Sequence, residues 1–202
     1  MSGSITVGGK ILASHDNVSG KLSMSENVDM SNVVFPAGHV IQVKYYENDN
    51  PVTAETTDTT IEQWYDLVVN ASIIPINPLS KILVSCSASG AGPSTGYEIS
   101  YRLLRSINGS SYTPIGGNMD PNNLALSNYI LMTGAGSGEG PYTVSNRYLD
   151  SPNTEYEIIY KLQLASGEVS TVYGNRAYST NSNAMWSNAG NSTITLMEIT
   201  NG

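Results

Sequence analysis

Short stretches in which apolar and polar residues alternate recur along most of the chain, and they predict β-strands. In residues 156–164 the apolar side chains occupy every second position, from Tyr156 through Tyr160 to Leu164, with mostly charged and amide residues between them. Residues 64–74, 81–89 and 97–103 show the same alternation. This pattern is typical of a strand that buries one face and leaves the other polar.

The first strand of the main body is predicted just after the FPAG turn. Ile41, Val43 and Tyr45 fall on one face there, while Gln42 and Lys44 fall on the other. This alternation predicts a half-buried strand with the apolar set on its own face.

Weaker strand patterns cover residues 129–133, 142–148 and 169–173, and the chain closes on a last strand, STITLMEI. The count from residue 39 onward is about eight to ten strands, joined by loops of very unequal length, which favours an antiparallel two-sheet β-sandwich. We expect an all-β fold of the jelly-roll type. An immunoglobulin-like sandwich is the alternative, although its Cys and Trp spacing is absent.

Residues 1–34 have a different texture, with isolated apolar residues separated by Ser, Asn, Asp and Gly. Such a segment cannot close a core alone. We expect an extended N-terminal arm or a short shaft that mediates attachment, or else a poorly ordered tail. The predicted organisation is therefore an arm over residues 1–34 and a sandwich, or knob, over residues 35–202.

Charge and composition exclude some partners. Nine Lys and Arg against seventeen Asp and Glu give a formal net charge of −8, which opposes binding to nucleic acid. No apolar run approaches the roughly 18 residues of a spanning helix, and the start MSGSITVGGK lacks the apolar centre of a secretory signal. We expect neither nucleic acid as a partner nor membrane insertion.

Residues that could carry catalysis or bind metal are scarce. The chain has two histidines, His15 and His39, and one cysteine, Cys86, which lies on the apolar face of its predicted strand. No zinc-binding motif occurs. Calcium is harder to exclude, because Glu47, Asp49 and Asp120 lie in polar loops, but no loop matches the EF-hand spacing and solvated turns are the preferred interpretation. The sequence therefore predicts a protein that is not an enzyme, with no cofactor, no metal and no catalytic residue.

Tyrosine is unusually abundant, with thirteen Tyr and two Trp against one Phe. Tyr and Trp suit surfaces that are partly apolar and partly wet, such as subunit interfaces and sugar-binding patches, although strands favour Tyr in any case. The candidate interface or glycan-contact residues are Tyr45, Tyr46, Trp64, Tyr101, Tyr156, Tyr160 and Trp186.

Several ordered segments carry a resemblance to a known group of proteins. They are FPAGHVIQVKYY, PLSKILVSCSAS, YEISYRLLR, NRYLDSPNTEYEIIYKLQ and STITLMEI. Together, over roughly residues 35 to 199, they resemble a domain of virion proteins from tailed phages, notably marine cyanophages. The resemblance implies a tail-fibre, capsid-decoration or other structural protein, with a trimeric jelly roll similar to those of tumour necrosis factor and C1q.

These observations lead to a functional hypothesis with two alternatives. We expect a homotrimeric capsid-decoration protein on the virion surface, made in the host cytoplasm, held by its N-terminal arm and contacting other virion proteins. The first alternative is a tail-fibre or tip protein that contacts host-surface polysaccharide. The second is a free carbohydrate-binding module, which would be a monomer with an exposed aromatic platform.

Overall fold

The computed structural model describes residues 3–7, 10–15, 22–24, 36–55, 64–91, 99–116, 118–119, 125–126, 128–130, 142–166, 171–177 and 190–201. These residues form strands, turns and irregular segments, with no helix among them. The predicted all-β fold is confirmed. The chain divides into two compact units, Met1–Phe35 and Pro36–Gly202.

The first unit contains a small antiparallel sheet with the strand order β1-β2-β3. Its strands are β1 (Gly3–Val7), β2 (Lys10–His15) and β3 (Leu22–Met24). The sequence pattern does not predict these strands, because apolar residues there are too sparse to show a period. The role of this segment in attachment stays a prediction.

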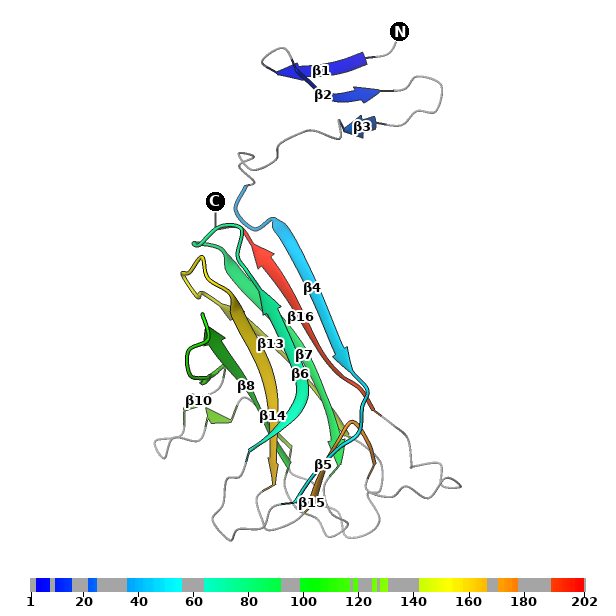
Figure 1. Ribbon diagram of the computed structural model, residues 1–202, viewed down its shortest axis with the longest axis vertical. Coiled ribbons are helices and arrows are strands. Elements are labelled where there is room, and N and C mark those ends of the chain that lie inside the picture. The colour runs from blue at the N-terminus through cyan, green and yellow to red at the C-terminus, as the bar shows by residue number, and fades with distance from the viewer. Residues whose placement is uncertain are drawn as a thin grey trace. The chain divides into compact units, whose positions relative to one another are not determined.

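The second unit contains two antiparallel sheets, which form the layers of a sandwich (Figure 1). Sheet I has the order β4-β16-β7-β15-β5, with β13 on the other edge of β7. Its strands are β4 (Val40–Asn48), β5 (Val52–Glu55), β7 (Lys81–Ala91), β13 (Tyr142–Asp150), β15 (Thr171–Gly174) and β16 (Ser192–Ile199).

Sheet II has the order β12-β8-β14-β6, with β9 also paired to β8. Its strands are β6 (Tyr65–Ile73), β8 (Ile99–Ile107), β9 (Thr113–Ile115), β12 (Asn128–Ile130) and β14 (Ile158–Ser166). A separate two-stranded pair joins β10 (Asn118–Met119) to β11 (Ala125–Leu126).

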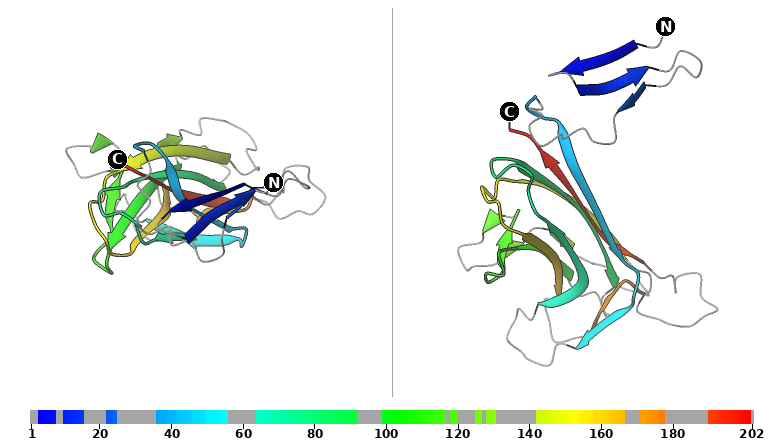
Figure 2. Two further views of the ribbon diagram at one scale, coloured as in Figure 1. Left: turned by 90° about the horizontal axis from the view of Figure 1, so that it is seen from above. Right: turned by 45° about the horizontal axis from the view of Figure 1, so that its top comes forward.

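The chain crosses repeatedly between the two sheets from β5 to β8 and again from β12 to β15. The last strand, β16, lies between β4 and β7, with β4 beside it along its whole length (Figure 2). The predicted antiparallel sandwich is confirmed, and this crossing order is compatible with its jelly-roll type.

The core lies between the two sheets and is built from alternate residues of the predicted strands. In β7, Ile82, Val84 and Cys86 face inward and are buried, and β14 contributes Ile158 and Leu162 in the same way. Strand β16 also alternates between buried and half-buried residues along its length. The sequence predicts these inward faces correctly because a core on one side enforces a period of two.

Strand β4 departs from the prediction. Tyr46 packs against the core, and its hydroxyl donates a hydrogen bond to the Ser72 carbonyl oxygen at 3.1 Å. Val43 and Tyr45 therefore point outward, and they are 56% and 57% exposed. The strand is where it was expected, but its apolar set faces away from the core.

A buried carboxylate fixes the end of the sandwich at which β4 begins. Glu198 on β16 is fully buried, and its two oxygens accept hydrogen bonds from the backbone N–H groups of Ile76, at 2.9 and 3.0 Å, and Asn77, at 3.0 Å. The Gln42 side chain also donates to Glu198, at 3.1 Å. These contacts tie β16 to β4 and to the loop that connects β6 in sheet II with β7 in sheet I.

A second polar contact joins the two sheets through Asp150, the last residue of β13. Asp150 is buried, and it accepts hydrogen bonds from Arg105 at 2.6 and 2.9 Å and from the Tyr160 hydroxyl at 2.8 Å. Burial, and then the adjacent negative charge of Asp150, raise the pKa of Tyr160, so this hydroxyl stays a proton donor.

The Glu198 contacts give a testable stability difference. In Glu198→Gln, a carboxylate oxygen that accepts backbone N–H groups is replaced by an NH2 group, which cannot accept. We expect a loss of about 1–3 kcal/mol in the free energy of unfolding, measured by urea denaturation. The control is Glu155→Gln, at an exposed position, which should change stability little. Equal stabilities for the two variants would contradict the role assigned to Glu198.

Candidate functional site

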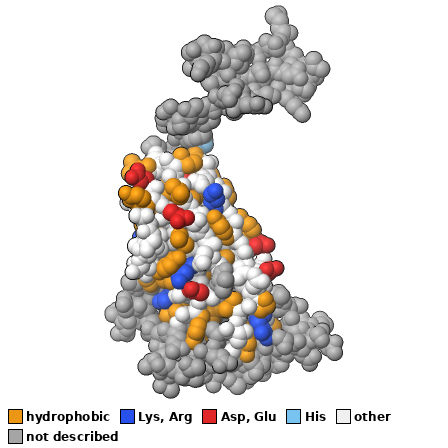
Figure 3. Space-filling view, viewed as in Figure 1, with side chains coloured by type: hydrophobic (Ala, Val, Ile, Leu, Met, Phe, Trp, Pro, Cys, Tyr) orange, Lys and Arg blue, Asp and Glu red, His pale blue; other side chains and the backbone are white. Residues whose placement is uncertain are grey.

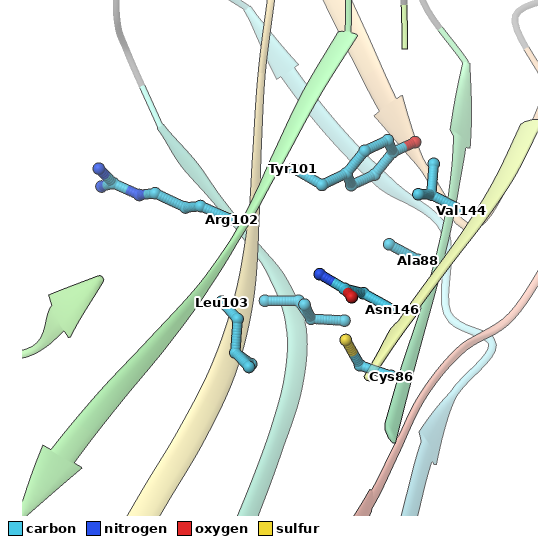
Figure 4. A pocket seen from close by; sticks show the side chains of 8 residues that line it. Cys86, Ala88, Tyr101, Arg102, Leu103, Val144 and Asn146 are labelled. Carbon is cyan, nitrogen blue, oxygen red and sulfur yellow. The ribbon is translucent and has the colours of Figure 1, made fainter. Parts of the chain in front are cut away.

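Among the described residues, a small gap lies between the two sheets, which Figure 4 shows from close by. Cys86, Ala88, Tyr101 and Leu103 are among its lining residues, and Arg102 points away from it. Its volume is about 10 Å³, about the space that one water molecule needs. The gap is therefore too small to hold a substrate or a cofactor.

Cys86 is a buried, unreactive thiol in this setting. Its side chain lies among apolar core residues, and burial raises the pKa of the thiol to about 11, although a backbone hydrogen bond with Asn146 opposes this shift. A thiol with such a pKa is protonated at neutral pH and is a poor nucleophile. His39 is exposed instead, with its ring beside the Pro36 carbonyl.

The residues that the structure describes contain no group of three or more His, Cys, Asp or Glu that could hold a metal ion. Glu47, from one of the acidic loops considered for calcium, accepts a hydrogen bond from the Tyr45 hydroxyl. Asp120, from the other loop, lies outside the described residues. Within the described part of the chain there is no helix long and apolar enough to cross a membrane.

The predicted contact aromatics separate into buried and accessible residues. Tyr101 and Tyr160 are 3% and 0% exposed, which corrects the expectation that they offer a contact surface, because their strand faces form the core. Tyr46 is half-buried against the core. Tyr45 and Tyr156 are exposed. Trp186 lies outside the described residues.

Trp64, the remaining predicted aromatic, belongs to a polar network beside sheet II. The Arg102 guanidinium lies 4.2 Å from the centre of the Trp64 ring, and its Nε donates to Gln163 at 2.8 Å. Gln163 donates in turn to Asp66 at 2.7 Å, and Lys161 forms an ion pair with Asp66 at 3.0 Å. The Lys161 ammonium also lies 4.1 Å from the Tyr112 ring centre.

The network determines the ionisation of Asp66. Burial alone would raise the pKa of this carboxyl group, but hydrogen bonds from Gln163 and Lys161 and the charges of Lys161 and Arg102 outweigh it and lower the pKa. Asp66 therefore stays charged at neutral pH. The Trp64 and Tyr112 rings thus lie beside amide and charged groups on this side of sheet II.

The outer face of sheet I, opposite the core, is the most continuous exposed feature among the described strands. Because the four strands β4, β16, β7 and β13 pair in register, its outward side chains form rows that cross the sheet. We number three rows as levels. Level 1 is Glu47, Thr193, Ser87 and Ser145; level 2 is Tyr45, Thr195, Ser85 and Arg147; level 3 is Val43, Met197, Leu83 and Leu149.

The levels differ sharply in chemistry. Levels 1 and 2 have small hydroxyl side chains on β16 and β7, and Ser145 continues level 1 onto β13. These side chains line a shallow depression of about 500 Å³. The larger side chains of the two levels are Glu47 and Tyr45 on β4 and Arg147 on β13. Level 3 is apolar throughout. Val43 and Leu149, at its two edges, are 56% and 47% exposed, and Met197 and Leu83 between them are half-buried.

Further apolar side chains are exposed at the end of the sandwich where β4 begins. They are Val40, Ile74, Ile76 and Leu79, and the last three belong to the loop that Glu198 holds. Hydrophobic side chains are also interspersed with polar surface and scattered charges on the side of the molecule drawn in Figure 3. Level 3 differs from these because it forms one unbroken row over four paired strands.

The sequence contains a signal for level 3 that simple alternation does not use. Ile82-Leu83-Val84, Leu196-Met197 and Tyr148-Leu149 place apolar residues at consecutive positions, which lie on opposite faces of a strand. In each group one residue faces outward, namely Leu83, Met197 or Leu149, and the remaining residues face the core. Consecutive apolar residues at matching positions of adjacent strands therefore predict that both faces are covered.

Comparisons with known proteins do not define a family. No family model matches the chain, and no curated protein matches it. Among solved structures, one titled "Structure of infectious bursal disease virus Gx strain" aligns with a TM-score of 0.38 and 8% identity, covering 81% of this chain and 38% of that chain. At this level the likeness establishes neither family nor function, and the resemblance to tailed-phage virion proteins stays a prediction.

The environment of Cys86 predicts its chemical reactivity. Because burial raises the pKa of the thiol, the reactive thiolate forms only when the pH approaches about 11 or when the protein unfolds. At pH 8 we expect a thiol-specific chromogenic disulfide to label the native chain very slowly. The same chain in concentrated urea should react completely within minutes. Fast labelling of the native chain would contradict a closed core at this position.

Proposed function

We propose that this chain is a non-enzymatic structural protein of a tailed-phage particle, a surface-exposed homotrimer that decorates the capsid and is anchored through residues 1–34. The observation that carries this proposal is the apolar row at level 3, Val43, Met197, Leu83 and Leu149. In the single chain its two edge residues are exposed and its two central residues are half-buried, although the row crosses four paired strands. Exposed apolar rows of this kind favour a protein–protein interface.

The chemistry of the described residues also supports a structural role. Cys86 is buried and its pKa is raised. His39 is exposed near the start of the second unit. The interior gap has room for about one water molecule. The two buried acids, Glu198 and Asp150, are each held by several hydrogen bonds that connect strands. Their contacts favour a role in stability over a role in catalysis.

Anchoring through the N-terminal segment is supported by where the second unit begins. The Gly38 N–H donates to the Thr200 carbonyl oxygen at 2.9 Å, and the Thr200 N–H donates to the His39 carbonyl oxygen at 2.9 Å. Residue 36 and the last strand therefore lie at one end of the sandwich, the end that level 3 approaches. An anchor joined at this end leaves the opposite end of the sandwich free to face outward.

A second candidate function is contact with host-surface polysaccharide, as the tip of a tail fibre or as a free carbohydrate-binding module. The Trp64, Arg102, Gln163 and Asp66 network, with Tyr112 nearby, favours it because rings beside amide and carboxylate groups suit sugar binding. The fibre tip would still be an oligomer. The free module would be a monomer.

Light scattering of the purified full chain tests the oligomer. We expect a mass three times the 21.5 kDa of one chain. Leu149→Ser should lower the measured mass at micromolar concentration because it removes an apolar side chain from level 3. Leu79→Ser, also at an exposed apolar position but on the β6–β7 loop, should not. A wild-type chain that stays monomeric at high concentration would contradict the homotrimer and favour the free module.

Antibody labelling of intact particles in electron micrographs tests the location. Decoration predicts gold particles over the whole capsid surface. Label at the tail tip would contradict decoration and favour the fibre. In that case, binding to host-envelope polysaccharide should be lost in Trp64→Ala and retained in Tyr156→Ala, an exposed aromatic outside the network. Absence of label from purified particles would contradict a virion protein altogether.

A further inference from the structure

The outer face of sheet I carries opposite charges on its two edges. Glu47 lies on β4 at level 1, and Arg147 lies on β13 at level 2, in the same row as Tyr45. Both charged residues are exposed. The two edges are three strand spacings apart, about 14 Å. Glu47 and Arg147 are therefore too far apart to pair within one chain, and each presents its charge at a separate edge.

Three properties of this face restrict what could cover it. It has an apolar row at one end, a hydroxyl-rich centre, and an acidic edge opposite a basic edge. A strongly acidic or strongly basic partner would satisfy only one of the two edges. A second copy of the same face can match this one. It can place its own apolar row against the apolar row, its basic edge against the acidic edge and its acidic edge against the basic edge.

The direction of the symmetry axis decides whether they match. A rotation axis parallel to the strands keeps every level at its own height, so level 3 of one copy meets level 3 of the next. The same rotation brings the β4 edge of one copy against the β13 edge of its neighbour. Arg147 of one copy then faces the Tyr45 ring of the next copy at the same level. The Glu47 carboxylate of that next copy lies about 7 Å further along the strand, within reach of the long Arg147 side chain.

An axis perpendicular to the strands gives a poorer match. With such a two-fold axis lying across the strands, β4 would cover β4 and β13 would cover β13. Arg147 would then meet the basic edge of its partner and Glu47 the acidic edge. Like charges placed opposite each other disfavour association, and level 3 would meet hydroxyl side chains unless the axis passed through that row.

We infer that the outer face of sheet I, built on β4, β16, β7 and β13, is the surface through which copies of this chain associate around an axis parallel to the strands. Arg147 of one copy contacts Tyr45 and Glu47 of the next. This inference rests on the self-association proposed above and adds the face, the axis and the pairs. Contact of an arginine with an aromatic ring and a carboxylate combines cation–π attraction with an ion pair.

Charge reversal tests the pairing directly. Glu47→Arg and Arg147→Glu should each raise the dissociation constant of the oligomer at least tenfold, measured by sedimentation over a range of concentrations. The double variant, which exchanges the two charges, should recover most of the wild-type affinity. Lys44→Glu is the matched control. Lys44 is an exposed, charged residue of the same strand, β4, but its side chain lies on the opposite face of the strand from Val43 and Tyr45.

The outcomes separate this inference from the proposed function. If the wild-type chain is a trimer and both single reversals leave its dissociation constant unchanged, the face assignment is overturned while the homotrimer stands. Weakening by both reversals without recovery in the double variant overturns the pairing of Arg147 with Glu47. A monomeric wild-type chain overturns the inference and the homotrimer together. Circular dichroism of each variant checks that the sandwich has folded.

Discussion

The burial of Glu198 is the constraint on which the arrangement of sheet I depends. Its carboxylate holds the Ile76 and Asn77 N–H groups and the Gln42 side chain, so this position of β16 must face inward. Because neighbours in a strand face opposite ways, Met197 must face outward. The register of β16 with β4 and β7 then turns Val43 and Leu83 outward as well. Glu198, together with Ile194 and Leu196 on the same buried face of β16, thus determines which apolar residues are exposed.

Alternation in the sequence predicts the strands of the core because a core on one side leaves no ambiguity. In β14, Ile158, Tyr160 and Leu162 face inward as expected, and the Asn108-Gly109 turn has the positive φ angles, 51° and 69°, of a tight hairpin turn. In β4 both sets contain large side chains, Val43 and Tyr45 on one and Tyr46 on the other. A shift by one residue exchanges such faces, and alternation alone could not choose between them.

The candidate site was only partly predictable for a related reason. The abundance of tyrosine marks both surface and core positions in this chain: Tyr45 is exposed, whereas Tyr160 is buried with its hydroxyl bound to Asp150. Asp150 and Arg105, which complete that contact, are 45 residues apart in the sequence, and no local pattern connects them. The outward row at level 3 also requires the register of four strands, which only the folded structure provides.

The position of level 3 along the strands connects the interface to anchoring. Of the three levels, level 3 is nearest to the end where residues 36–39 meet Thr200, and the hydroxyl-rich levels lie further from it. In the proposed oligomer, apolar contact between copies would therefore be concentrated at that end. An axis parallel to the strands places residue 36 of every copy at the same end of the oligomer. Every sandwich of the proposed oligomer is then joined to its N-terminal segment at the same end, as the proposed attachment to a single surface requires. A two-fold axis across the strands would instead place residue 36 of the two copies at opposite ends, so the proposed anchoring and the match of charges favour the same symmetry.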